Sequence, residues 1–276
     1  MDGREQKPEK VIEVRDLVAH YGERKILDGV SMDVYAGEIM VIIGGSGSGK
    51  STLLRHVMAL EHGTSGTVKI LGRDPAALDA KEALDLRKKI GVAFQGGALF
   101  SSMTVGENIM LPLYEHTVLD RTTMEIMARL KLEVVGLAGF EDLMPAELSG
   151  GMVKRAAFAR AIIMDPKILF CDEPSAGLDP VIAAALDNLL LRMREAMGMT
   201  IVVVTHELES AFSIADRITV LDQGRILLTG TTEELRETKI ERIQNLLQRR
   251  TEEEIVDPEE YLERLMGERS GERARL

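Results

Sequence analysis

IMVIIGGSGSGKSTLL, residues 39–54, is the stretch that decides the fold of this chain. Its first five residues are all apolar and predict a short strand buried on both faces, as in a parallel sheet. A glycine-rich turn follows, and Lys50 opens a segment with helical apolar periodicity. The stretch therefore matches G-x-x-x-x-G-K-[ST] in the strand–loop–helix context that this phosphate-binding pattern requires.

The residue types of this loop suit a triphosphate. Glycines lack a Cβ atom, so the loop can curl with its N–H groups pointing at phosphate oxygens, and the helix N-terminus adds roughly half a positive charge. Lys50 is expected to reach the β- and γ-phosphates, and the Ser51 hydroxyl to ligate Mg²⁺. A flexible glycine–serine linker, the alternative, would not be flanked by a buried strand and a GKST run. The predicted nucleoside triphosphate site comprises Gly44, Gly45, Ser46, Gly47, Ser48, Gly49, Lys50, Ser51 and Thr52.

Composition restricts the class of protein. The chain has 276 residues, enough for one large or two small domains, and no apolar run approaches the roughly 18 residues that cross a bilayer. The single cysteine, Cys171, excludes an intramolecular disulfide, and no export signal opens the sequence, so we expect a reducing, cytoplasmic setting. A net charge of −11 argues against a nucleic-acid partner, because such binding relies on clustered Lys and Arg.

Hydrophobic periodicity predicts an α/β nucleotide-binding core. Alternation at 11–14 and 30–34 indicates half-buried antiparallel strands, whereas continuous apolar runs at 168–171 and 200–204 suit central parallel strands. Residues 96 to about 161 are predicted to be helical. The core therefore carries a helical insertion between two of its strands. The other predicted elements are a helix from Lys50 to near Gly63, strands at 67–71 and 90–94, a helical stretch at 76–89, and two strands within 215–228.

Two of the predicted strands end in residues that can support hydrolysis. Asp172 and Glu173 follow an apolar strand; the first would hold Mg²⁺ through water, and the second would polarise the attacking water as a general base. His206 follows the strand at 200–204. A lone histidine is more often a structural hydrogen-bonding residue than a catalytic one, so both roles stay open.

A second anion-binding pattern, LSGGM at 148–152, precedes a helix. Ser149, Gly150 and Gly151 place a hydroxyl and bare N–H groups at that helix N-terminus. A chain with one nucleotide needs only one γ-phosphate cradle, so this one would serve another subunit; an ordinary serine cap is the alternative. Gln95, at the junction of core and insertion, could contact Mg²⁺ or the lytic water, or simply lie on the surface.

In this order, GGSGSGKST, Gln95, LSGGM, ILFCDEP, SAGLDP and His206 resemble the motifs of the ATP-binding cassette (ABC) ATPases over residues 11–230. The resemblance implies an α/β P-loop NTPase fold, with a RecA-like mixed-sheet core, an antiparallel β subdomain and a helical subdomain at about 96–161. It implies catalytic roles for Glu173, His206, Gln95 and Lys50, and Mg²⁺ ligation by Ser51, Gln95 and Asp172. It also implies adenine stacking by Tyr21, a signature at Ser149, Gly150 and Gly151, and a D-loop at Asp179.

The resemblance also implies partners. Each motif occurs once, so a head-to-tail homodimer is expected, with ATP between Lys50 of one protomer and Ser149 of the partner subunit. Met152 replaces the family's usual glutamine. With the runs at 94–109 and 173–180, it resembles ATPases of the Mla type, which serve bacterial lipid transporters that work with MCE-domain proteins.

This narrower resemblance implies ATPase activity that drives phospholipid transport between the inner and outer membranes. The implied partners are an integral-membrane permease dimer, an MCE-domain protein and a small regulatory subunit. The chain would lie peripherally on the cytoplasmic face of the bacterial inner membrane. Two alternatives stay open: an ABC ATPase for another cargo, such as a small solute or drug, or a non-transport ABC protein acting on DNA or ribosomes, whose typical long insertions or tandem cassettes this chain lacks.

Two surfaces are candidates for contacts with other subunits. Ala98, Leu99 and Phe100 are expected to form an apolar step where the family receives a short permease helix; a packed loop without a partner is the alternative. Residues 231–276 are predicted to form a C-terminal helical extension that packs on its own core or contacts another subunit. Its signals are a capping box at Thr231 and Glu234, a helical stripe of Ile240, Ile243 and Leu247, and a second helix from Asp257.

Overall fold

The computed structural model describes residues 9–248 and divides the chain into two compact units, Met1–Thr238 and Lys239–Leu276. Each unit is described by itself. The expected division after residue 230 remains a prediction. No helix in the part of the chain that the structure describes is long and apolar enough to cross a membrane.

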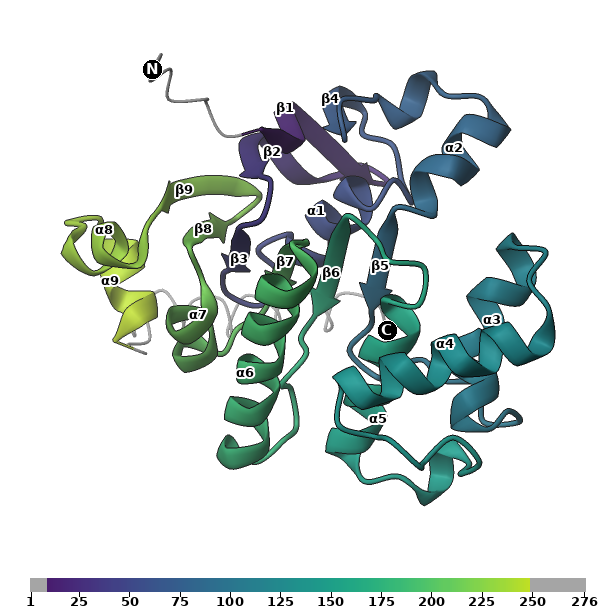
Figure 1. Ribbon diagram of the computed structural model, residues 1–276. Helices are drawn as coiled ribbons and strands as arrows, with labels where there is room; N and C mark the ends of the chain where they lie inside the picture. Colours follow the sequence, from purple (N-terminus) through teal and green to yellow (C-terminus); the bar gives the residue numbers. More distant parts are fainter. Residues whose placement is uncertain (1–8, 249–276) are drawn as a thin grey trace, which may run out of the picture. The chain divides into compact units, whose positions relative to one another are not determined.

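The first unit contains two sheets (Figure 1). Its strands are β1 (Lys10–Tyr21), β2 (Arg24–Tyr35), β3 (Ile39–Ile43), β4 (Ser65–Ile70), β5 (Ile90–Ala93), β6 (Ile168–Asp172), β7 (Thr200–Val204), β8 (Arg217–Asp222) and β9 (Arg225–Gly230). The smaller sheet is antiparallel, in the order β2-β1-β4. The larger sheet has the order β5-β6-β7-β3-β8-β9 and is parallel except for β9, which pairs antiparallel with β8. The predicted α/β class with an antiparallel subdomain is thus confirmed.

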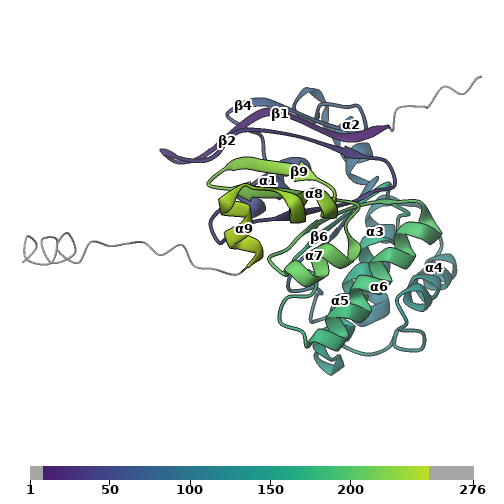
Figure 2. The ribbon, with the colours of Figure 1, turned by 90° about the vertical axis from the view of Figure 1, so that its left-hand side faces the viewer.

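Some helices pack on the larger sheet, and others pack on one another as a helical insertion. They are α1 (Lys50–Val57), α2 (Ala80–Arg87), α3 (Val105–His116), α4 (Arg121–Val134), α5 (Gly150–Ala161), α6 (Pro180–Met197), α7 (Leu208–Ile214) and α8 (Thr232–Glu237). Helix α1 lies between the two sheets and contacts β1, β2, β4 and β7 (Figure 2). Helices α6 and α7 pack on each other and on β7 and β3. Because helices cover both faces, every residue of β3 and β7 is buried, as their continuous apolar runs predict.

The helical insertion consists of α3, α4 and α5, which pack on one another. Their N-termini are capped by local side chains: the Thr104 hydroxyl accepts from the Glu107 N–H, Asp120 from Thr123, and Ser149 from Met152. Helix α5 also packs on β5, so the insertion is joined to the core at the sheet edge. The expected helical subdomain is therefore present, with its signature at the start of α5.

Some boundaries differ from the expectations. Helix α1 ends at Val57 rather than near Gly63, because Ala59 adopts a left-handed backbone (φ +56°) that no helix continues through. The long helix α6 was not anticipated. Its signals are nonetheless present: the Asp179 carboxylate caps it, Pro180 occupies its first turn, and Gly198 (φ +61°) ends it.

The C-terminal expectations are met in part. Thr231 and Glu234 form the predicted capping box at the start of α8, which belongs to the first unit. In the second unit, α9 (Glu241–Leu247) contains Ile243 and Leu247, and Ile240 is its N-cap residue. The helix predicted from Asp257 lies outside the described residues.

Candidate nucleotide site

The candidate site lies at one edge of the larger sheet. Strands β3, β5, β6 and β7 run parallel, so their carboxyl ends meet at this edge, where open α/β sheets bind ligands. The segments that leave these ends contain Lys50, Gln95, Glu173 and His206 respectively. Residues from four distant parts of the sequence are thereby brought to one edge (Figure 1).

The phosphate loop depends on two glycines. At Gly44, an added Cβ would lie 2.1 Å from the Leu221 carbonyl oxygen. Gly49 has φ +105° and caps α1, and a Cβ there would lie 2.8 Å from a methyl carbon of Leu27. At Gly45 an added Cβ would meet nothing within 4 Å, so this stretch of backbone is open on that side. The loop therefore needs glycine for packing at its two ends, while Gly45, Ser46 and Gly47 are exposed between them.

Lys50 lies within its own loop. Its ammonium group donates to the carbonyl oxygens of Gly44 (2.8 Å) and Gly45 (3.0 Å). Burial lowers the pKa of this lysine, and the charges of Glu173 and Asp172 oppose that shift. The site thus holds a half-buried cation close to two carboxylates and to an exposed Ser51. Ser48 Oγ is buried without a hydrogen-bond partner among the described residues, an unusual state for a hydroxyl.

Glu173 is held in place from several directions. Its backbone adopts φ +47°, rare for a residue with a side chain, and its N–H donates to the Val204 carbonyl (2.8 Å). The side-chain oxygen Oε2 lies 2.9 Å from His206 Nδ1 and accepts from the Thr205 hydroxyl (3.2 Å) and the His206 N–H (3.3 Å). Residues held in such sparsely populated conformations cluster at functional sites.

Asp172 is the last residue of β6 and precedes Glu173, the candidate general base. Burial raises the pKa of this carboxyl, and the neighbouring Glu173 adds to the rise, while Arg55, Lys154 and Lys50 act in the opposite direction. Two adjacent carboxylates at the end of a buried strand repel each other unless cations lie near. A divalent ion would relieve that repulsion.

The adenine and signature candidates lie on other elements, at the end of β1 and at the start of α5. Tyr21 ends β1, and its side chain is 54% exposed; the Arg55 guanidinium donates to its hydroxyl (2.6 Å). Ser149 and Gly150 are exposed at the start of α5, whereas Gly151 is buried. Asp179 is exposed and caps α6. Thr52 is buried within α1.

Two residues at the site were missed by the sequence analysis. Thr205, which precedes His206, binds the Glu173 side chain. Lys154 is buried in α5 and donates to the backbone carbonyls of Gln95 and Glu173. A threonine before the histidine carries no distinctive sequence signal, and neither does Lys154, which lies two residues beyond LSGGM and next to Arg155.

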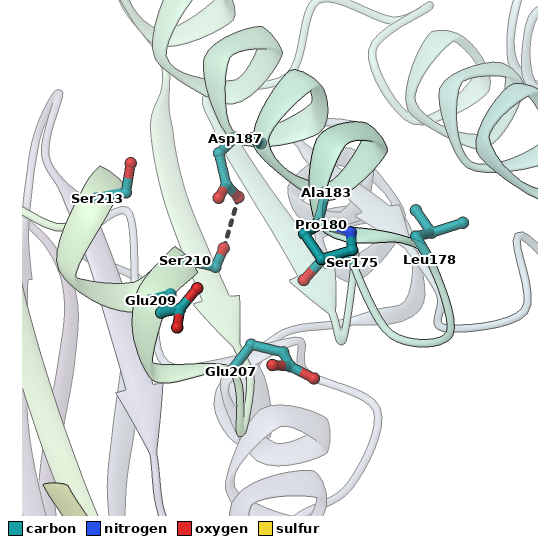
Figure 3. Close-up of a pocket in the computed structure, with 10 residues that line it drawn as sticks. Ser175, Leu178, Pro180, Ala183, Asp187, Glu207, Glu209, Ser210 and Ser213 are labelled. Atoms are coloured by element: carbon teal, nitrogen blue, oxygen red, sulfur yellow. Dashed lines mark hydrogen bonds between the residues drawn. The ribbon is translucent and has the colours of Figure 1, made fainter.

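A cavity of about 290 Å³ lies between α6 and α7, and Glu207 is one of the residues that line it (Figure 3). Asp187 and Ser210 meet across it in a hydrogen bond of 2.5 Å, with the hydroxyl donating. Burial raises the pKa of Asp187, and the Ser210 hydroxyl opposes the rise. Ser175 Oγ, on the wall of the same cavity, is buried without a partner among the described residues. The Asp187–Ser210 hydrogen bond therefore joins α6 to α7, the helices that follow β6 and β7 in the chain.

Comparison with known proteins gives the family. The model of the ABC transporter family matches residues 27–176. The chain belongs to the ABC transporter family. A curated relative from Haemophilus influenzae, the intermembrane phospholipid transport system ATP-binding protein MlaF, is 38% identical over 239 residues, which cover 87% of this chain and 90% of that protein. The probable ribonucleotide transport ATP-binding protein mkl of Mycobacterium leprae is 40% identical over 224 residues, covering 81% of this chain and 65% of its own length.

Solved structures agree with this ABC assignment. The ATP-binding cassette MJ0796, in a dimeric post-hydrolysis structure bound to ADP and Pi, superposes with a TM-score of 0.73 at 32% identity, covering 80% of this chain and 98% of that one. The protein cbiO1 from Clostridium perfringens gives 0.76 at 28% identity, covering 87% and 99%. This ABC cassette therefore binds ATP and hydrolyses it to drive transport.

Proposed function

We propose that this chain is the ATPase subunit of a bacterial phospholipid transporter, acting as a head-to-tail homodimer bound to a permease on the cytoplasmic face of the inner membrane. The observation that carries the proposed chemistry is the meeting of Lys50, Asp172, Glu173 and His206 at one sheet edge. The observation that carries the proposed cargo is the 38% identity to an MlaF protein over 87% of this chain.

The residues present fit a nucleotide with Mg²⁺. Lys50 and the open backbone at Gly45 suit the phosphates, and the unpartnered Ser48 hydroxyl suits a polar ligand. No group of three or more His, Cys, Asp or Glu residues that could hold a metal occurs within residues 9–248. That agrees with Mg²⁺, which is usually bound by one or two carboxylates together with substrate phosphates. Ser51, Gln95 and Asp172 would hold the ion, which would neutralise charge on the phosphates.

Hydrolysis then follows from the groups at the strand ends. Glu173 orients a water molecule and accepts its proton, and Lys50 stabilises the charge that develops on the γ-phosphate. His206, bonded to Glu173 Oε2, fixes the carboxylate's direction. Gln95 is exposed just after β5, and its side chain would sense the occupied state.

The signature supports a composite site. Ser149 and Gly150 are exposed at the N-terminus of α5, and α5 packs on α3, α4 and β5. An exposed helix N-terminus with a serine and two glycines suits a phosphate. We infer that it binds the nucleotide held by Lys50 of the partner subunit, as the dimeric relative bound to ADP and Pi suggests. Tyr21 would stack on the adenine of the nucleotide held in its own chain.

The permease-docking surface is a groove of about 460 Å³ beside β5. Phe94 (42% exposed) and Phe100 (52% exposed) contribute apolar surface, and Arg87, Lys88 and Arg160 contribute positive charge. This composition suits a short amphipathic helix that carries an acidic residue. Ala98 and Phe100 of the predicted apolar step line this groove, whereas Leu99 is not among its lining residues.

Two proposed partners rest on the resemblance of the sequence to Mla-type ATPases, and the rival cargo rests on the name of one relative. An MCE-domain protein and a small regulatory subunit would complete a transporter of the Mla type. The mycobacterial relative, named for ribonucleotide transport, favours a small solute instead. The two cargoes are distinguished by what the purified complex contains.

The test is to purify the tagged protein from its native membranes in mild detergent. We expect a polytopic permease, an MCE-domain protein and phospholipid to co-purify with it. A permease with a solute-binding protein would instead favour the small-solute cargo. A preparation without any membrane partner would overturn the transporter role. Phe100→Glu should lose the permease while the isolated subunit still binds ATP. Phe140→Glu, which changes an exposed aromatic residue outside the groove, should keep it.

Lys50→Ala tests the site itself. It should abolish ATP hydrolysis in the purified subunit, measured as phosphate release, because the developing charge on the γ-phosphate loses its cation. Near-normal phosphate release would refute the assignment of Lys50.

A further inference from the structure

Lys154 is a cation buried at the junction of three segments. It lies on α5, five residues after Ser149, and only 9% of it is exposed. Its ammonium group donates to the carbonyl oxygen of Gln95, just after β5, and to that of Glu173, just after β6 (3.3 Å). One side chain therefore connects the signature helix to the two strand ends where the metal and the attacking water are expected.

Burying an ammonium group is costly unless it is hydrogen-bonded. Lys154 meets this cost with backbone carbonyls. Burial lowers the pKa of its ammonium group, and the nearby charges of Asp172 and Glu173 oppose that shift. Backbone acceptors fix the position of a chain segment rather than the rotamer of a side chain. The arrangement is therefore suited to placing the Gln95 and Glu173 segments relative to each other.

The backbone of Glu173 needs such support. Its φ of +47° persists only where the surroundings hold it. Its N–H donates to the Val204 carbonyl (2.8 Å), and its own carbonyl accepts from the Lys154 ammonium group (3.3 Å) and from the Ala176 N–H (3.3 Å). Without Lys154 the carbonyl keeps only the hydrogen bond from the Ala176 N–H, so the φ angle of Glu173 is held less firmly. Rotation about the N–Cα bond of Glu173 would then move its carboxylate relative to His206.

We propose that Lys154 is a positioning residue for ATP hydrolysis: by binding the carbonyls of Gln95 and Glu173, it holds the general base in its working direction and ties that base to the signature helix. This inference rests on the proposed role of Glu173. It gives the lysine no contact with the nucleotide, so its loss affects turnover rather than binding.

The same helix offers a matched control. Arg155, the next residue, also donates to a backbone carbonyl, that of Val135 (3.4 Å), but within the helical subdomain. Arg155→Met removes a cation and a carbonyl bond from α5 without touching either strand end. General damage to α5 would appear in both variants, whereas loss of positioning would appear only at Lys154.

The first experiment compares steady-state hydrolysis by Lys154→Met, Lys154→Arg and Arg155→Met. We expect Lys154→Met to lower kcat at least tenfold with KM for ATP within twofold of the parent. Lys154→Arg, which restores a donor to both carbonyls, should recover kcat to within about threefold, and Arg155→Met should keep the parent kcat. Unchanged kcat in Lys154→Met, or an equal loss in Arg155→Met, would overturn the proposal.

A second measurement separates positioning from other effects. Single-turnover hydrolysis is measured for Glu173→Gln with and without Lys154→Met. If Lys154 acts through Glu173, the second substitution adds less than a twofold loss; a further tenfold loss would overturn the proposal. Near-normal turnover by Glu173→Gln alone would instead refute the base assignment. If Lys154→Met fails to fold, Lys154→Gln, which keeps one donor, replaces it and should show an intermediate kcat at unchanged KM.

Discussion

At the scale of single residues, the central feature of the site is the set of hydrogen bonds that hold the Glu173 carboxylate. Glu173 Oε2 receives bonds from the Thr205 hydroxyl, the His206 N–H and the His206 ring, while the other carboxylate oxygen is not part of this group. A general base needs a fixed direction and one oxygen available for a proton. The structure shows His206 as a hydrogen-bonding partner of Glu173, and its part in catalysis remains a proposal.

The first prediction follows from this arrangement. Glu173→Gln keeps the shape and the hydrogen-bond acceptor but loses the ability to accept a proton, so turnover should fall roughly 10²- to 10⁴-fold. ATP binding, measured by equilibrium dialysis, should change little. Glu209→Gln, which alters an exposed acid three residues beyond His206, should leave both quantities unchanged. Turnover near the parent value in Glu173→Gln would refute the assignment.

The second prediction concerns the two neighbouring glycines of the phosphate loop. Gly44→Ala forces a methyl group to within 2.1 Å of the Leu221 carbonyl oxygen, so the backbone must shift. We expect the free energy of unfolding, measured in urea without nucleotide, to fall by about 1–3 kcal/mol. Gly45→Ala meets nothing within 4 Å and should be within about 0.5 kcal/mol of the parent. Equal stabilities of the two variants would contradict the packing at Gly44.

At the scale of elements, α6 and α7 are joined by a buried polar pair. The Ser210 hydroxyl donates to the Asp187 carboxylate (2.5 Å), and both residues are less than 10% exposed. Since α6 follows the loop after Glu173 and α7 follows His206, this bond connects the helices behind the base and its histidine. A buried carboxylate with a single donor is costly to leave unpaired.

The third prediction uses the pH dependence of that pair. Ser210→Ala should lower the free energy of unfolding at pH 7.5 by about 1–3 kcal/mol. Burial raises the pKa of Asp187 above its unfolded value, so lowering the pH protonates this carboxyl in the folded state first and relieves the penalty. The loss should therefore be smaller at pH 5 than at pH 7.5. Ser213→Ala, an exposed serine of the same cavity, should cost less than about 0.5 kcal/mol at either pH. If the loss of unfolding free energy in Ser210→Ala grows as the pH falls, the pair does not depend on an ionised Asp187.

Some features of the fold and of the candidate site could be predicted from the sequence, whereas others could not. Strands β3 and β7 match their predicted limits, because each is a continuous apolar run of five residues, too short for a typical helix. The phosphate loop and the Asp172–Glu173 pair were found because their chemistry depends on residue types at fixed spacing. Lys154 was not found, because its partners are main-chain carbonyls, one of them 59 residues away, and any residue can supply a carbonyl.

At the scale of the whole molecule, the first unit gathers Lys50, Glu173 and His206 at one edge of the larger sheet and exposes Ser149 at the start of α5. Helix α1 packs between the sheets, whereas α5, which begins at the signature, packs on α3, α4 and β5. The chain holds each motif once. Two copies arranged head to tail would complete two sites with the residues that a single copy leaves exposed, among them Ser149 and Asp179.

The last prediction tests whether the signature acts across that dimer. With ATP, Glu173→Gln should double its mass in light scattering, because nucleotide that is bound but not hydrolysed keeps two copies together. The double variant Glu173→Gln with Ser149→Arg should still bind ATP, since Lys50 and its loop are intact, yet stay monomeric, because a bulky cation replaces the serine that faces the γ-phosphate held by the partner subunit. If the double variant dimerises as readily as Glu173→Gln alone, Ser149 is not part of the interface. If it loses ATP binding as a monomer, the signature serves the nucleotide of its own chain, and the head-to-tail arrangement is wrong.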